Sequence, residues 1–256
     1  MDSLEAMGEG RPKLDSSELH SPHPREPFWG WMDVALFAVA TPALVALAIV
    51  LMTVLKALRW PVDRALSILS IQSVLYVAAY FLLWLILMVR HSESVWDALP
   101  WAVGPGLGAR LFVSGFALAF AAALLGVALH APNIDNPIVR MMRDPVSIFA
   151  IVVFASTVGP AVEEAFFRGF LQPVAARSLG AAGGIALTSL VFASLHGFEY
   201  HWSWKHLLLV FVASLAFGWT RWRWNSTGAS TLLHAGYNLT FFVGYLIQGR
   251  ILLSHG

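Results

Sequence analysis

The chain has 256 residues, of which 58% are hydrophobic and only 12% are charged. A soluble domain usually has about 25% charged residues, so this chain has too few charges to cover a water-soluble globule. The apolar content excludes intrinsic disorder, and a formal net charge of +1 argues against a basic nucleic-acid-binding protein. The absence of cysteine excludes a disulfide scaffold, a thiolate zinc site and a cysteine nucleophile. The composition therefore predicts a polytopic helical membrane protein.

The first 28 residues are predicted to form a flexible polar tail. They contain Pro12, Pro22, Pro24 and Pro27. No apolar core follows a basic start within them, so they do not have the pattern of a signal peptide.

Long apolar segments follow the tail, each uncharged or carrying a single histidine. A membrane helix needs about 20 residues, with a range of about 17–25, and the sixth segment reaches this length only with its flanking tryptophans. We therefore expect about seven to eight membrane helices, the eighth being a re-entrant or interfacial stretch. Backbone groups in lipid must pair within their own segment, so we predict an all-α transmembrane bundle. The segments are Val34–Leu55, Ala65–Val89, Leu111–Ile134, Pro145–Val162, Ser178–Leu195, Leu207–Thr220 and Trp224–Gly249.

Three charged residues lie at the end of the fourth apolar segment, namely Glu163, Glu164 and Arg168. A charge at the centre of a membrane helix costs roughly 2.5–3.5 kcal/mol, so embedded charges indicate function. Glu164 and Arg168 are four residues apart on one stripe of a helix, and we expect them to form an ion pair. Glu163 then points elsewhere and is the candidate general base. A salt-bridged helix end would explain Glu164 and Arg168 but not Glu163.

Two further segments carry polar residues that could join this acidic group. His196 ends the fifth segment, and the last contains His234 and Asn238, which share one helix face. Taken singly, each has a structural interpretation, as a helix-end histidine or as hydrogen-bonding residues between helices. Taken together, we expect His234 and Asn238 to find partners in Glu163 and His196. A carboxylate, two imidazoles and an amide can supply a general base, its orienting partner and oxyanion donors.

The residues after His196 suggest a metal site less clearly. Glu199 and His201 are close in sequence, but the segment is neither HExxH nor HxxEH. His196 and His201 are five residues apart, so a straight helix would not direct them to one ion. We interpret His201, Lys205 and His206 as interfacial residues.

The three motifs in this order resemble those of the CPBP family of intramembrane proteases. They are EExxxR at Glu163–Arg168, FxxxH at Phe192–His196 and HxxxN at His234–Asn238. The family includes the CAAX prenyl endopeptidases of the Rce1 type and the Abi-type immunity proteins, and it is usually described with eight transmembrane helices. The resemblance covers about residues 145–249. It implies a catalytic core at residues 145–250, preceded by N-terminal transmembrane helices at residues 29–144.

The resemblance also implies a role for each motif residue. Glu163 with His196 would activate the attacking water, and His234 and Asn238 would stabilise the tetrahedral oxyanion. The resemblance therefore implies an endopeptidase that uses water activated by glutamate and histidine.

Glu164 and Arg168 would, by the same resemblance, hold the helix and tune Glu163. The family is often named a metalloprotease, although a glutamate-dependent mechanism without a tightly held metal is also proposed for it. Two histidines and a glutamate would suffice as ligands for zinc. Zinc therefore remains one option for the cofactor, and we favour the metal-free alternative.

The predicted function is hydrolysis of peptide bonds in membrane-associated substrates, CAAX-type prenylated ones among them, by a multi-pass protein of the plasma membrane. The expected partners are the lipid bilayer and a membrane-associated peptide or protein, with no nucleic acid. One alternative is a non-catalytic Abi-like immunity or scaffolding protein. Another is a proton-coupled transporter, which usually has paired repeats; the sequence has no convincing internal repeat. Site-2-type proteases need HExxH, which this chain lacks.

Overall fold

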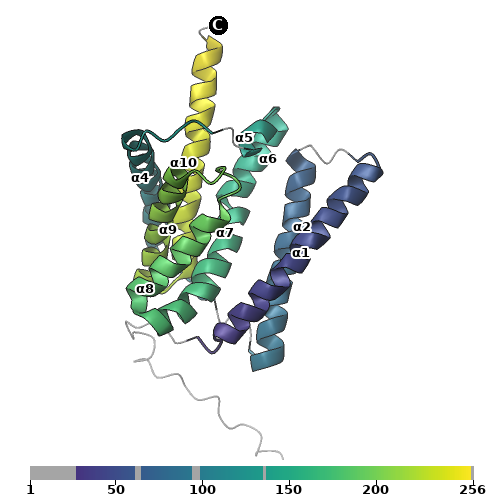
Figure 1. The fold of residues 1–256 in the computed structure, drawn as a ribbon. Coiled ribbons are helices and arrows are strands. Elements are labelled where there is room, and N and C mark those ends of the chain that lie inside the picture. The colour runs from purple at the N-terminus through teal and green to yellow at the C-terminus, as the bar shows by residue number, and fades with distance from the viewer. Residues whose placement is uncertain (1–26, 61–64, 94–98, 135–136, 255–256) are drawn as a thin grey trace, which may run out of the picture.

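The fold is all-helical, as predicted (Figure 1). The computed structural model describes residues 27–60, 65–93, 99–134 and 137–254, and within these residues every regular element is a helix. The predicted tail, residues 1–28, lies outside the described residues except for its last two. We describe the chain as a helical hairpin, a three-helix group and an interrupted helical segment.

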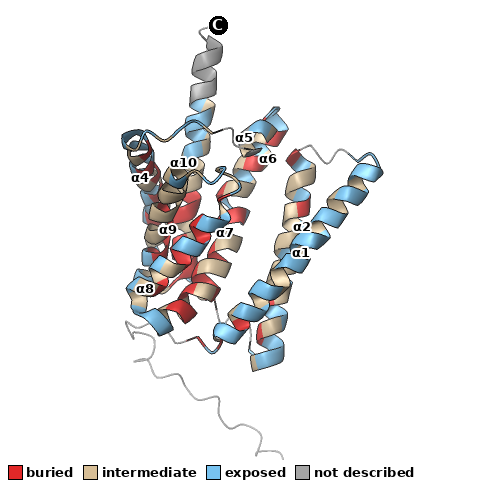
Figure 2. Cartoon of the chain, viewed as in Figure 1, coloured by how far each residue is buried: buried red, intermediate tan, exposed pale blue. Residues whose placement is uncertain are grey.

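The hairpin consists of α1 (Trp31–Ala57) and α2 (Ala65–His91), which lie against one another at one side of the molecule (Figure 1). Most side chains of α1 are exposed (Figure 2), as expected for a helix that faces lipid. The carboxylate of Asp33 accepts a hydrogen bond from the Gly30 N–H at 2.8 Å at the start of α1. Arg90 and His91 at the end of α2 contact the same carboxylate at 2.6 and 3.1 Å. The Asp33 carboxylate therefore joins the two helices at one end of the hairpin.

The three-helix group consists of α4 (Leu107–Ala128), α9 (Trp204–Trp224) and α10 (Thr227–Ser254). The most extensive helix–helix contact within the described residues joins α4 and α10. Glycines allow this approach: a Cβ atom at Gly115 would collide with the Leu233 carbonyl oxygen, and one at Gly236 with that of Phe112. Small residues at a crossing bring two backbones into contact, which favours association in lipid.

The interrupted segment runs from Pro145 to Leu195. Asp144 caps its first helix by accepting hydrogen bonds from the Val146 and Ser147 N–H groups, both at 3.0 Å. The segment follows the short helix α5 (Pro137–Met141) and consists of α6 (Pro145–Ser156), α7 (Val158–Glu164), the π-helix η2 (Ala165–Leu171) and α8 (Gln172–Leu195).

Three interruptions divide this segment where the sequence suggests continuous helix. The backbone leaves helical geometry at Thr157, with φ −133° and ψ −73°. Pro173, the second residue of α8, has no backbone N–H to donate back into η2. Gly180, at φ +73°, forms a turn inside α8 that a residue with a Cβ atom adopts only under strain. The predicted apolar segment Pro145–Val162 is therefore broken at Thr157, and the predicted segment Ser178–Leu195 contains the turn at Gly180.

Four elements are long and apolar enough to cross a membrane, judged by length and composition among the described residues: α1, α2, α4 and the segment Pro145–Leu195. The predicted number of seven to eight membrane helices is not confirmed. α9 and α10 are not among the four, because their charged and polar side chains lower the mean hydropathy. Two of these polar side chains, His206 of α9 and His234 of α10, line the cavity of the candidate site.

Candidate active site

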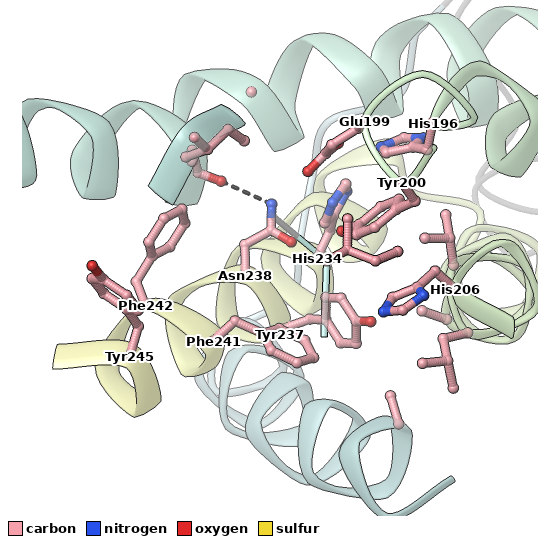
Figure 3. A pocket seen from close by; sticks show the side chains of 18 of the residues that line it. His196, Glu199, Tyr200, His206, His234, Tyr237, Asn238, Phe241, Phe242 and Tyr245 are labelled. Atoms are coloured by element: carbon pink, nitrogen blue, oxygen red, sulfur yellow. Dashed lines mark hydrogen bonds between the residues drawn. The ribbon is translucent and has the colours of Figure 1, made fainter. Parts of the chain in front are cut away.

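A cavity of about 760 Å³ lies among α2, α4, the interrupted segment, α9 and α10. Its wall contains the predicted residues Glu163, His196, His234 and Asn238. Figure 3 shows the last three around one space, with His196 at the end of α8 and with His234 and Asn238 both on α10. Four of the six predicted site residues therefore lie around one cavity.

The remaining two, Glu164 and Arg168, are fully buried beside the cavity and form the predicted ion pair. Arg168 Nη1 lies 2.9 Å from Glu164 Oε1. The Nη2 atom of Arg168 donates to the Ser214 carbonyl oxygen at 3.0 Å and to its hydroxyl at 2.6 Å. The guanidinium also lies 4.7 Å from the ring centre of Phe192 and 5.4 Å from that of Phe217, in cation–π contact. The pair therefore links η2 to α8 and α9.

His234 connects this ion pair to the cavity. Its Nδ1 lies 3.0 Å from Glu164 Oε1, and its Nε2 lies 3.9 Å from Glu163 Oε2. Because an ionised carboxylate only accepts hydrogen bonds, Nδ1 carries the proton. The other ring nitrogen, Nε2, faces Glu163. The ring stacks on Phe217, with centres 4.3 Å apart. The expected contact of His234 with Glu163 is present as an ion pair at 3.9 Å, but the hydrogen bond of the ring goes to Glu164.

Glu163 has a different environment from its neighbour Glu164. Its side chain is 28% exposed and lines the cavity, whereas Glu164 is fully buried. Successive residues on a helix point about 100° apart, and the prediction that the two carboxylates diverge is confirmed.

His196 is held by its own helix. Its Nδ1 lies 2.8 Å from the Phe192 carbonyl oxygen, four residues earlier, and its ring packs against Phe192 with centres 4.5 Å apart. Since a carbonyl only accepts, Nδ1 carries the proton, and in the neutral ring Nε2 is an acceptor. The FxxxH spacing is explained by this contact. Within the described residues no hydrogen bond joins His196 to Glu163.

Asn238 joins α10 to the interruption between α6 and α7. Its Nδ2 donates to the Ala155 carbonyl oxygen at 2.9 Å (Figure 3, dashed line). Only the NH₂ group of an amide can donate, so this contact sets the orientation of the side chain. The backbone leaves helical geometry at Thr157, two residues after Ala155. One N–H of the Asn238 amide is used here, and the second is available for another acceptor.

The sequence reasoning missed several polar residues of the cavity wall, namely Glu199, Tyr200, His206 and Tyr237. Figure 3 shows all four around the same space as His234. Burial, with the nearby Glu199 carboxylate, raises the pKa of Tyr200, so its hydroxyl stays protonated. His206, which we interpreted as interfacial, lines the cavity and stacks on Tyr200 with ring centres 5.3 Å apart.

A signal for Glu199 was present in the sequence: it follows His196 by three residues, one helical turn further. The contribution of α2, through Gln72 and Tyr76, had no such signal. Of the other residues interpreted as interfacial, His201 is exposed, and Lys205 donates to the carbonyl oxygen of His130 at 2.9 Å.

The predicted zinc option does not fit this arrangement. Among the described residues no three histidine, aspartate or glutamate side chains gather closely enough to hold a metal ion.

Residues 145–240, which carry Glu163, Glu164, Arg168, His196, His234 and Asn238, match one family model. Its description is type II CAAX prenyl endopeptidase Rce1-like. Over these residues, the chain is similar to that family. The resemblance predicted from the three motifs is thereby confirmed. No curated protein and no solved structure matches the chain. The Rce1-like match and the four long apolar elements together indicate a protease that is an integral membrane protein.

Proposed function

We propose that the chain is an intramembrane endopeptidase that hydrolyses peptide bonds of membrane-associated substrates, CAAX-type prenylated ones included. One observation carries this proposal: Glu163 lines a cavity of the Rce1-like segment beside His234, whose other nitrogen is held by the buried Glu164–Arg168 pair. A carboxylate and a fixed imidazole on one cavity wall have the chemistry that water activation needs.

In the proposed reaction Glu163 is the general base. Its carboxylate takes a proton from a water molecule while the water oxygen forms a bond to the scissile carbonyl carbon. His196 orients this water as an acceptor through Nε2. The proton on Glu163 then passes to the leaving amide nitrogen, the C–N bond breaks, and the products are a carboxylate and an amine. Moving the proton in this way typically contributes 10²–10⁴-fold in rate.

The negative oxygen of the tetrahedral intermediate needs hydrogen-bond donors. Asn238 supplies the second N–H of its amide, because the first is fixed on the Ala155 carbonyl oxygen. His234 presents Nε2 from a ring whose other nitrogen is anchored to Glu164. The charged form of this ring donates to the oxyanion, whereas the neutral form accepts from water.

We assign Glu164 and Arg168 positioning roles. Neither lines the cavity, and both are fully buried. Their ion pair fixes the carboxylate that holds His234 Nδ1, and Arg168 ties it to α9 through Ser214.

The plasma membrane is the proposed location of the protein. Fractionation of cells that express the tagged protein would test this location.

The test is turnover by the purified protein in lipid nanodiscs, with quenched fluorescent S-farnesylated peptides as probes. We expect Glu163→Gln to lower kcat/KM by about 10²–10⁴-fold, because it removes the base and keeps the shape of the side chain. His196→Gln is expected to lower it too. Glu93→Gln and His201→Gln are matched controls, because both residues are exposed and lie outside the cavity. Unchanged cleavage in Glu163→Gln and His196→Gln would sink the assignment.

The competing function is a non-catalytic Abi-like scaffold, and one observation favours it. The buried contacts of Glu164, Arg168, Ser214 and His234 join four elements, α7, η2, α9 and α10, and would stabilise the bundle without any chemistry. A scaffold predicts no cleavage of any probe and no effect of Glu163→Gln beyond stability. Metal analysis of the same preparation tests whether the reaction proceeds without a metal. Stoichiometric zinc in the preparation, together with loss of turnover on chelation, would overturn the metal-free mechanism.

A further inference from the structure

The helix α2 contributes two polar side chains to the cavity, Gln72 and Tyr76, which are one helical turn apart. Both lie outside residues 145–240, which match the family model, and the proposed reaction uses neither of them. Polar side chains inside an apolar membrane helix are costly, and those that face a cavity indicate a pathway or a binding site. A role for this pair is therefore sought in the ligand of the cavity.

The Tyr76 hydroxyl is the acceptor in its hydrogen bond with Gln72, whose Nε2 atom donates at 2.9 Å. A phenol both accepts and donates, and its own proton does not point back at an N–H donor. Ser70 and Ser73 of the same helix donate to carbonyl oxygens four residues earlier, at 2.7 and 2.8 Å. No described residue accepts the proton of Tyr76, so this proton is available to a molecule in the cavity.

The ring of Tyr76 is held against α6. It stacks on Phe154, with ring centres 5.8 Å apart and planes inclined by 16°. The next residue of α6, Ala155, accepts the hydrogen bond from Asn238. Tyr76 and Asn238 therefore reach α6 within about one helical turn of one another, roughly 5 Å, from two different helices. The Tyr76 hydroxyl also lies within electrostatic reach of the Glu163 carboxylate.

A peptide in this cavity meets hydrogen-bond donors from two helices. Both α2 and α10 pack on α6, and both line the cavity. In an extended peptide, successive backbone carbonyls point to opposite sides. If Asn238 of α10 holds the carbonyl that is attacked, a neighbouring carbonyl points away from α10. That carbonyl has lost its hydrogen bonds to water and needs a donor from the protein.

We propose that Tyr76 is a substrate-binding residue whose hydroxyl donates to a backbone carbonyl of the bound peptide beside the scissile bond, and that Gln72 directs this proton into the cavity. The inference deepens the proposed function and rests on it in taking the ligand to be a peptide. This hydrogen bond is present in the bound substrate and in the transition state alike. Tyr76 therefore contributes to affinity and not to the rate of the chemical step.

Tyr76→Phe tests this role, because it removes the hydroxyl and keeps the ring that stacks on Phe154. The Kd of an S-farnesylated peptide with a neutral fluorophore is measured by fluorescence anisotropy in phosphatidylcholine nanodiscs. The Glu163→Gln background keeps the peptide from being consumed. We expect Tyr76→Phe to raise Kd about 3- to 10-fold, the effect of one neutral hydrogen bond. Tyr80→Phe, one turn further along α2, is the matched control and should leave Kd unchanged, because Tyr80 does not line the cavity.

A set of modified peptides locates the hydrogen bond. In each peptide one backbone amide is replaced by an (E)-alkene, which keeps the extended shape and removes the carbonyl oxygen. Where the missing carbonyl is the one that Tyr76 binds, Tyr76→Phe no longer weakens binding, because the interaction is already lost. We expect this at one amide position and the full effect of Tyr76→Phe at the others. The readout compares peptides within one variant, so a change in the amount of folded protein does not produce it.

Kinetics with Glu163 intact give an independent measurement. Tyr76→Phe should raise KM about 3- to 10-fold and leave kcat nearly unchanged, as expected for loss of uniform binding. Equal Kd values for Tyr76→Phe and Tyr80→Phe would overturn the proposal, as would a full effect of Tyr76→Phe at every amide position or a fall in kcat alone. Binding that depends on Tyr76 without cleavage would contradict only the proposed function. Cleavage that does not depend on Tyr76 would contradict only the role of Tyr76.

Discussion

The α1–α2 hairpin and the helices around the cavity differ in what their interiors contain. In α1 only Asp33 is buried, and the buried residues of α2 are Ala65, Ile71, Leu83 and Leu87. Around the cavity the buried side chains include charged and polar ones. Figure 2 shows buried residues of all kinds concentrated in the elements away from the hairpin. The buried charged and polar residues are Glu164, Arg168, Gln172, Thr188, Ser189, Ser214, Thr220, Thr227, Ser230 and His234.

The difference teaches what holds each region together. Lipid solvates apolar helices as well as a protein core does, so the hairpin needs little polar contact. The ion pair of Asp33 and Arg90 lies at the helix ends, where the Arg90 side chain is 40% exposed. Polar groups around the cavity have to satisfy one another, as Arg168 does with Glu164 and Ser214. Loss of an ion pair is therefore expected to lower the free energy of unfolding more around the cavity than in the hairpin.

The largest expected effect is that of Arg168→Met. It leaves the Glu164 charge buried without its cation, and breaking a buried pair in this way typically costs about 3–5 kcal/mol. For a chain of this length we expect the Tm to fall by roughly 10 °C, measured by thermal unfolding in detergent. The double variant Glu164→Gln/Arg168→Met should recover part of this loss. If the Tm of Arg168→Met stayed within about 2 °C of the wild-type value, the pair would not be buried in the way described.

The second largest expected effect is that of Asn238→Ala. It removes an N–H from the proposed oxyanion site, and loss of one such donor typically lowers kcat by about 10²–10³-fold. It also removes the hydrogen bond to Ala155, so a fall in Tm should accompany the fall in kcat. Steady-state kinetics on the farnesylated probe, with KM and kcat separated, measure the first effect. A change in KM alone would contradict the oxyanion role.

Gly236→Val tests the crossing of α4 and α10. The added Cβ atom would collide with the Phe112 carbonyl oxygen, so the two helices must separate. Overpacking of this kind typically costs about 1–3 kcal/mol. Gly244→Val on the same helix is the matched control, because a Cβ atom there has no heavy atom within 4 Å. Equal unfolding temperatures for the two variants would argue against the close contact.

Asp33→Asn, in the hairpin, should have the smallest effect. A partly exposed ion pair contributes about 0.2–1 kcal/mol, so the expected fall in Tm is only a few degrees. Turnover should stay near the wild-type value, because Asp33 does not line the cavity. A loss of stability as large as that of Arg168→Met would remove the distinction between the two regions.

Particular residues mark how far the sequence could predict the site. The spacing of Glu164 and Arg168 predicted their ion pair, because a four-residue separation survives even in the π-helix η2. The partner of His234 could not be predicted in this way, since it depends on how α10 meets α7. The interruption at Thr157, where Asn238 reaches Ala155, likewise has no local signal strong enough to override an apolar run.

By itself, the sequence determined that the chain lies in a membrane, that it is helical, and that it carries the three motifs of the Rce1-like segment. The scarcity of charge and the spacing of residues along a helix can be read directly from the sequence. Only the tertiary structure decided that His234 is held by Glu164, that Asn238 binds Ala155, and that Glu199, Tyr200 and His206 share the cavity with Glu163. The physical reason is that these contacts join elements far apart in the chain. They depend on helix crossings and breaks, which the packing of all the helices sets together.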